Sequence, residues 1–189
     1  CNAHKIKGIL NGIDYSVFDP AHDKGICTKY TSKNFVKNKE KCKQDLCKEF
    51  NLEYIKGKPI IGFVSRLVDQ KGLDLFYAAE HELRHMDAQL VILGSGEKRY
   101  EEYLDWLCKT SDNIRVYIGY NGTLANKIYA GSDMFLMPSK FEPCGLSQLV
   151  ALKYGSLPIV RATGGLDNTI VGYPLDNSNG FKFWRYDSW

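Results

Sequence analysis

The chain has 189 residues, of which 44% are hydrophobic and 25% are charged, and its formal net charge is +3 at pH 7. This is the composition of an ordinary globular protein of about one domain, and it excludes a low-complexity chain. No stretch approaches about eighteen consecutive apolar residues and no charged segment followed by an apolar one opens the chain, so we expect neither a membrane span nor a signal peptide.

The Lys residues are concentrated in residues 1–58, but they are scattered over loops and one predicted helix without interleaved aromatic residues or Arg pairs. This pattern favours a solvated surface over a nucleic-acid site. The six cysteines include no C-x-x-C pair. Cys42 and Cys47 come without a nearby His or a second pair, so reduced thiols are favoured over a zinc site or a disulfide framework.

The first third of the chain gives weak signals of regular structure. Residues 6–10 could form an opening strand, followed by a turn at Asn11 and Gly12. Residues 16–37 look irregular, and residues 39–50 have the pattern of a surface helix.

From residue 59 onward, short apolar runs alternate with segments of helical spacing. Residues 59–64 form a nearly continuous apolar run, which is typical of a strand buried on both faces. The alternation predicts an α/β fold: a parallel sheet of βαβ units with helices on both faces. The expected strands are residues 59–64, 89–93, 113–118, 134–137 and 157–160, with an alternating segment at 180–184, and the expected helices are residues 72–86, 97–110, 123–130 and 146–154.

Ligands of parallel sheets bind at the carboxyl ends of the strands, so the loops after the expected strands are the candidate site. In the loop 65–72, Arg66 and Lys71 lie five residues apart before a helix start, where a guanidinium and an ammonium could bind phosphate together. Spacing alone equally allows Arg66 to pair with Asp69 or another carboxylate and Lys71 to be solvated. After the fourth strand, Glu142 could favour the start of the following helix or contact a ligand.

Two glycine-rich loops and one aromatic residue are weaker candidates. GSGE at residues 94–97 lacks the third glycine of a dinucleotide fingerprint and is better explained as a tight turn. TGGL at residues 163–166 could let a backbone approach a ligand, but alone it favours a simple turn. Tyr120 follows a glycine at a strand end and could stack on a base, although surface Tyr residues are common.

The His residues do not complete a catalytic or metal site. His81 and His85 lie four residues apart on one expected helix without the adjacent acidic residue or a third ligand, so we expect a helix surface. Cys144 has no His near it in the sequence, which argues against nucleophilic catalysis by this thiol.

Three segments together carry a resemblance to a known family: FVSRLVDQKGLDL, IYAGSDMFLMPSKFEPCGLSQLVALKYGSLPIVRATGGL and GILNGID. They resemble the C-terminal domain of bacterial glycogen synthases and plant starch synthases, in the family's order. The resemblance implies the GT-B architecture, in which two Rossmann-like domains face each other across a cleft. Residues 1–189 are then expected to form the single Rossmann-like C-terminal domain, which binds the donor nucleotide, with the N-terminal domain absent from this sequence.

The family transfers glucose from ADP-glucose to the non-reducing end of an α-1,4-glucan with retention of configuration. The resemblance implies that Arg66, Lys71 and Glu142 are the catalytic residues: the two cations would grip the donor diphosphate, and the carboxylate would accept from hydroxyls of the donor glucose. It also implies that Tyr120 stacks on the adenine. Backbone amides that hold sugar and phosphate are implied at Cys144, Gly145, Leu146 and Ser147.

Two positions depart from related sequences. Many retaining GT-B enzymes carry a second Glu eight positions after the first, where this chain has Val150, and glycogen and starch synthases commonly lack that Glu. Lys140 stands where relatives often have Arg. The family's N-terminal Lys-Thr-Gly-Gly loop and its catalytic-region His and Asp are not in this sequence, so the chain by itself is expected to be inactive.

The resemblance implies ADP-glucose or ADP as the donor ligand and, through the absent domain, an α-1,4-glucan as acceptor. It implies no cofactor, no metal, no nucleic acid and no membrane, and a cytoplasmic location in a bacterium or a plastid location in a plant. Two alternatives stay open. One is a retaining GT-B glycosyltransferase that uses UDP-glucose, and the other is a noncatalytic module that binds a nucleotide sugar or a glycan.

Overall fold

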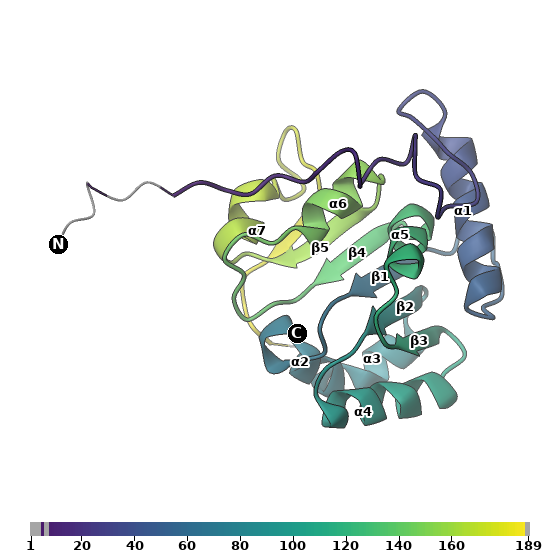
Figure 1. Cartoon of the computed structure of the whole chain (residues 1–189). Coiled ribbons are helices and arrows are strands. Elements are labelled where there is room, and N and C mark those ends of the chain that lie inside the picture. The colour runs from purple at the N-terminus through teal and green to yellow at the C-terminus, as the bar shows by residue number, and fades with distance from the viewer. Residues whose placement is uncertain (1–4, 6–7, 188–189) are drawn as a thin grey trace.

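The computed structural model describes residue 5 and residues 8–187, and these are built around a single six-stranded sheet (Figure 1). Every pair of neighbouring strands is parallel, and the strand order is β3-β2-β1-β4-β5-β6. The expected parallel sheet is therefore confirmed. The strands are β1 (Ile60–Val64), β2 (Gln89–Gly94), β3 (Ile114–Ile118), β4 (Met134–Met137), β5 (Leu157–Arg161) and β6 (Phe181–Phe183).

Helices cover both faces of the sheet, as the alternation of elements predicted. One face packs against α2 (Leu73–Ala78), α3 (Glu80–His85) and α4 (Lys98–Lys109). The other face packs against α1 (Phe35–Glu49), α5 (Gly122–Gly131), α6 (Ser147–Lys153) and α7 (Gly164–Thr169).

Successive residues of the central strands enter opposite cores, which explains their unbroken apolar runs. In β2, Leu90 and Ile92 pack with residues of α4, whereas Val91 and Leu93 pack with residues of α1 and α5. All four side chains are at most 3% exposed. Burying an aliphatic side chain of this size contributes about 1.5–3 kcal/mol, so β2 is among the most strongly held elements of the fold.

Three local predictions are wrong. The expected helix 72–86 is divided at Ala79, whose backbone leaves the helical region at φ −103° and ψ 19°. Residues 8–10 are not a strand, because no described strand pairs with them, and residues 6–7 lie outside the described part. No turn forms at Asn11 and Gly12, and the first turn follows Asp14, whose carbonyl accepts from Val17 and Phe18.

The last fifty residues contain one element that the sequence did not predict. Residues 164–169 form the short helix α7 although two glycines, which are poor helix formers, open it. The alternating segment near residue 180 is a strand, β6, as expected. Among the described residues, no helix has both the length and the apolar character needed to cross a membrane.

Candidate functional site

The strand order places two loops of the chain side by side. β1 is the point where the order reverses, because β2 and β3 lie on one side of it and β4 to β6 lie on the other. Ligands of open parallel sheets bind outside the carboxyl ends of the strands at such a reversal. The loop after β1 carries Arg66 and Lys71, and the loop after β4 carries Glu142, so the fold brings both loops to this position.

Lys71 and Glu142 form an ion pair between these two loops. The Lys71 Nζ atom lies 2.5 Å from Glu142 Oε2, and the side chains are only 17% and 10% exposed. Ser139 donates a hydrogen bond to the same carboxylate oxygen at 3.3 Å. Within the described chain, Glu142 Oε1 has no protein donor, so this oxygen can accept from a hydroxyl group of a ligand. The alternative of a solvated Lys71 is wrong.

Arg66 lies in the same loop, five residues before Lys71. Its side chain is exposed and makes no hydrogen bond or ion pair to any described residue. The alternative pairing with Asp69 is wrong, because the oxygens of Asp69 accept from Arg99, Tyr100 and Lys140 instead. An unpaired guanidinium at a strand end is an available site for an anion.

Two adjoining cavities lie beside Arg66 and Lys71. Arg66 and Tyr120 line a cavity of about 240 Å³, and Tyr120 is 92% exposed at its edge. Lys71 lines a smaller cavity of about 20 Å³ together with Ser139 and Ser147. Both cavities share Val64 and Ser65 as lining residues. Arg66 and Lys71 therefore border adjoining cavities, and Glu142, which lines neither cavity, is joined to Lys71 by the ion pair.

The corner between Glu142 and α6 presents backbone donors. Gly145 has φ +67°, a conformation that favours glycine. The buried amide of Gln148 donates to the carbonyls of Cys144 at 3.0 Å and Gly145 at 3.1 Å, which fixes the corner from behind. In the described residues no acceptor takes the N–H groups of Cys144, Gly145 or Leu146. Gln148 was missed in the sequence, where its only signal is a polar residue inside an apolar helix.

The two glycines of α7 support this corner. Gly165 N–H donates to the Glu142 carbonyl at 2.9 Å. A Cβ atom on Gly164 would lie 2.2 Å from the Glu142 carbonyl oxygen, and one on Gly165 would lie 2.0 Å from the Cys144 carbonyl oxygen. The TGGL segment is therefore more than a turn, because only glycine lets its backbone contact the corner.

The GSGE loop borders the Arg66 cavity through Gly94 and Ser95, whereas the His pair and the described cysteines form no site. Gly94 and Gly96 pack against the backbone of Ser65 and Leu67, as expected for a tight turn. The rings of His81 and His85 stack on exposed α3, and no group of three or more metal-binding side chains occurs within the described ranges. The five described cysteines are free.

Larger cavities of about 520 and 560 Å³ border α1 and the carboxyl end of α6, away from the candidate site. There the Lys39 ammonium donates to the carbonyls of Tyr129, Ala130 and Tyr154. These carbonyls end α5 and α6, so Lys39 has a structural explanation as the cap of two helices.

Comparisons with known proteins give consistent matches. Residues 48–183 match the family model described as "Glycosyl transferases group 1". The chain is 46% identical to a glycogen synthase of Bacillus cereus, with 97% of this chain and 39% of the relative covered. It is 48% identical to a glycogen synthase of Desulforudis audaxviator, with 98% and 37% covered. The chain thus spans less than two fifths of the length of these relatives.

A solved structure matches over the same extent. The catalytic domain of starch synthase IV from Arabidopsis thaliana, bound to ADP and acarbose, superposes with a TM-score of 0.90 at 37% identity. The match covers 98% of this chain and 39% of that one.

Proposed function

Because the chain belongs to the group 1 glycosyl transferases, we propose that it is the donor-binding domain of a glycogen or starch synthase. Its fold is that of the C-terminal half of a GT-B glycosyltransferase. The proposed reaction transfers glucose from ADP-glucose to the non-reducing end of an α-1,4-glucan with retention of configuration. The observation that carries the proposal is the Lys71–Glu142 pair at the reversal of the strand order, next to a cavity that adjoins the one lined by the unpaired Arg66.

The two cations suit the leaving group of this reaction. When the bond between glucose and ADP breaks, negative charge grows on the diphosphate. Lys71 is held by Glu142 before the donor arrives, and Arg66 is free to pair with the diphosphate, so both cations can stabilise the charge that grows in the transition state. Glu142 Oε1 accepts from a hydroxyl of the donor glucose, while Oε2 remains paired with Lys71.

The remaining contacts divide between base and sugar. Tyr120 stacks on the adenine at the cavity that it shares with Arg66. The free N–H groups of Cys144, Gly145 and Leu146 donate to the sugar and phosphate, and Ser147 begins the adjoining helix. In this proposal the glucan acceptor is held by the N-terminal domain of the whole enzyme, which acts in the cytoplasm of a bacterium or the plastid of a plant.

Calorimetric titration of the chain with ADP tests the donor site. We expect wild-type protein to bind ADP and Arg66→Ala to bind about 10- to 100-fold more weakly, because a charge-assisted hydrogen bond contributes about 1.5–3 kcal/mol. Arg84→Ala is the matched control, since this residue pairs with Glu80 on α3 and touches neither site cavity. Equal binding by wild type and Arg66→Ala would remove Arg66 from the site.

Two further measurements separate the alternatives. Competition between ADP-glucose and UDP-glucose identifies the nucleotide, and a clear preference for UDP-glucose contradicts the proposed donor. Transfer of glucose to glycogen is then assayed with a full-length protein that contains this chain. If that protein binds ADP-glucose but transfers no glucose, the noncatalytic binding module is the better assignment.

A further inference from the structure

The two loops of the candidate site are bonded to each other beyond the Lys71–Glu142 pair. The backbone N–H of Lys140 donates to the Gln70 carbonyl at 2.8 Å, and the Gln70 side-chain amide donates to the Phe141 carbonyl at 3.1 Å. These contacts join residues immediately beside Lys71 to residues immediately before Glu142. The loops therefore behave as one unit, whose internal spacing sets the distance between the two charged groups.

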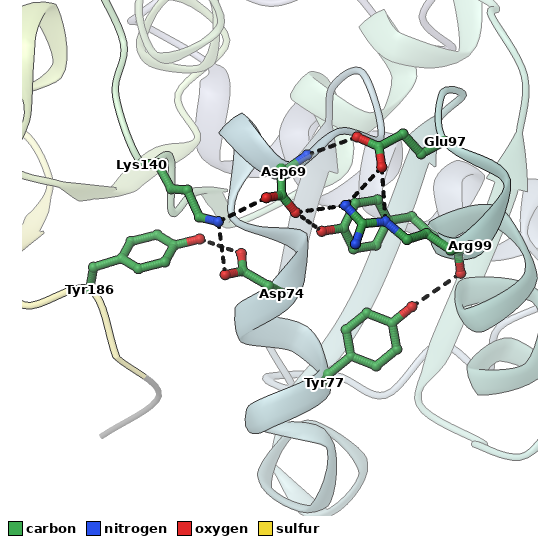
Figure 2. Close-up of polar contacts among 8 residues, drawn as sticks. Asp69, Asp74, Tyr77, Glu97, Arg99, Lys140 and Tyr186 are labelled. Carbon is green, nitrogen blue, oxygen red and sulfur yellow. Dashed lines mark hydrogen bonds and ion pairs between the residues drawn. The ribbon is translucent and has the colours of Figure 1, made fainter.

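The side chain of Lys140 adds an ionic bridge to this unit (Figure 2). Its Nζ atom lies 3.2 Å from Asp69 Oδ2 and 3.1 Å from Asp74 Oδ2. Asp69 is held in turn by Arg99, at 2.9 Å, and by the Tyr100 hydroxyl, both of which belong to α4. Hydrogen bonds from Tyr100 and Lys140 lower the pKa of Asp69, so its carboxylate stays charged at neutral pH.

The C-terminal segment closes the bridge from the other side. The Tyr186 hydroxyl donates to Asp74, and its ring centroid lies 5.3 Å from both the Lys140 ammonium and the Arg161 guanidinium. Arg161 also donates to the Lys140 carbonyl at 2.7 Å. The backbone and the side chain of Lys140 are thus held by three separate parts of the chain.

We propose that Lys140 is a positioning residue for the donor site, an inference that rests on the proposed function. Lys140 lies two residues before Glu142, and its partner Asp69 lies two residues before Lys71. Lys140 lines neither site cavity, so it acts through the bridge and does not touch the donor. The bridge keeps the Lys71–Glu142 pair in place while Lys71 contacts the donor diphosphate and Glu142 Oε1 accepts from the donor sugar.

Hydrogen exchange tests the bridge independently of any ligand. In Lys140→Gln, amide exchange of the segments around residues 69–72 and 138–146 should rise at least threefold over wild type, whereas Lys140→Arg should restore the wild-type rates. Lys109→Gln is the control, because it breaks an exposed ion pair of α4 with Asp105 and leaves the bridge intact. Wild-type exchange of both segments in Lys140→Gln would overturn the proposal.

A mutant cycle in ADP-glucose affinity tests the consequence for the site. Because half-exposed ion pairs each contribute modestly, Lys140→Gln should weaken binding about threefold to tenfold. In a background that carries Asp69→Asn and Asp74→Asn, the same change should weaken binding less than about twofold, since the bridge is already lost. An equal loss in both backgrounds would mean that Lys140 acts directly on the donor charge, and it would overturn the positioning role.

The two readouts also separate the inference from the proposed function. If wild-type protein fails to bind ADP-glucose, the proposed function is wrong and the role of Lys140 at a donor site falls with it. If wild-type protein binds and only the cycle fails, the proposed function stands and the positioning role is wrong.

Discussion

Gly165 offers a direct test of how the corner after β4 is supported. In Gly165→Ala the new Cβ atom would lie 2.0 Å from the Cys144 carbonyl oxygen and 2.4 Å from the Cys144 carbonyl carbon. Real Cβ atoms essentially never approach closer than 3.0 Å, so α7 and the corner must separate by about 1.0 Å. The atoms concerned belong to the backbone, and no side-chain rotation can relieve the contact.

The energetic consequence has a definite sign. Alanine is a better helix former than glycine by about 1 kcal/mol, so helix propensity alone would raise the free energy of unfolding. Overpacking of this kind costs about 1–3 kcal/mol, so after the gain in helix propensity we expect a net loss of up to about 2 kcal/mol. The affinity for ADP-glucose should fall more than tenfold, because a shift of about 1 Å in positioned groups can cost about 100-fold in function.

Urea unfolding and calorimetry with ADP-glucose measure the two effects, and circular dichroism verifies that the variant is folded. Gly122→Ala is the matched control at the start of α5, where the nearest atom to the new Cβ is the Tyr120 hydroxyl at 3.8 Å. That variant should be as stable as wild type or slightly more stable. Unchanged stability together with unchanged ADP-glucose affinity in Gly165→Ala would refute the reasoning.

Three further predictions concern other parts of the molecule. Lys39→Met should lower the free energy of unfolding by about 1–3 kcal/mol in urea titrations, because the carbonyls that end α5 and α6 lose their donor; an unchanged midpoint would contradict this. Burial raises the pKa of the Cys42 thiol to about 12, so at pH 8 a thiol reagent should label exposed Cys27 while Cys42 stays unlabelled by peptide mass mapping. The hydrogen bond from Tyr100 lowers the pKa of Asp69 in the folded state, so the unfolded state binds more protons and stability falls as the pH drops below about 4. The difference in melting temperature between wild type and Asp69→Asn should therefore shrink between pH 5 and 3, and a growing difference would reverse the sign of the argument.

Much of the fold could be predicted because the central strands are buried on both faces. Strands such as β1 and β2 send alternate residues into two apolar cores, so their sequence is a nearly unbroken apolar run. The division of the expected helix 72–86 at Ala79 could not be predicted, because neither Gly nor Pro marks this position in the sequence. Helix α7 was hidden for the opposite reason, because its two glycines serve contact with the Glu142 corner at the expense of helix propensity.

The location of the site could be predicted from the sequence, but the ion pairs among its residues could not. Strand ends located Arg66, Lys71 and Glu142, and the resemblance supplied their roles. Spacing could not decide whether Arg66 pairs with Asp69. The residues that bind the Asp69 carboxylate, Arg99 and Lys140, lie 30 and 71 positions further along the chain. Ion pairs of this range depend on the strand order, which local sequence patterns do not contain.

Arg66 differs from Asp69 and Lys71, the other charged residues of its loop, because it pairs with no described residue. Asp69 is neutralised by Arg99 and Lys140, and Lys71 is neutralised by Glu142. If Arg66 had been drawn into either pair, no unpaired cation of this loop would face the cavity at Tyr120. The ion pairs of Asp69 with Arg99 of α4 and with Lys140 of the loop after β4 therefore have two effects. The Lys140 pair fixes the spacing of Lys71 and Glu142 in our proposal. Both pairs also leave the Arg66 guanidinium available for an anionic ligand.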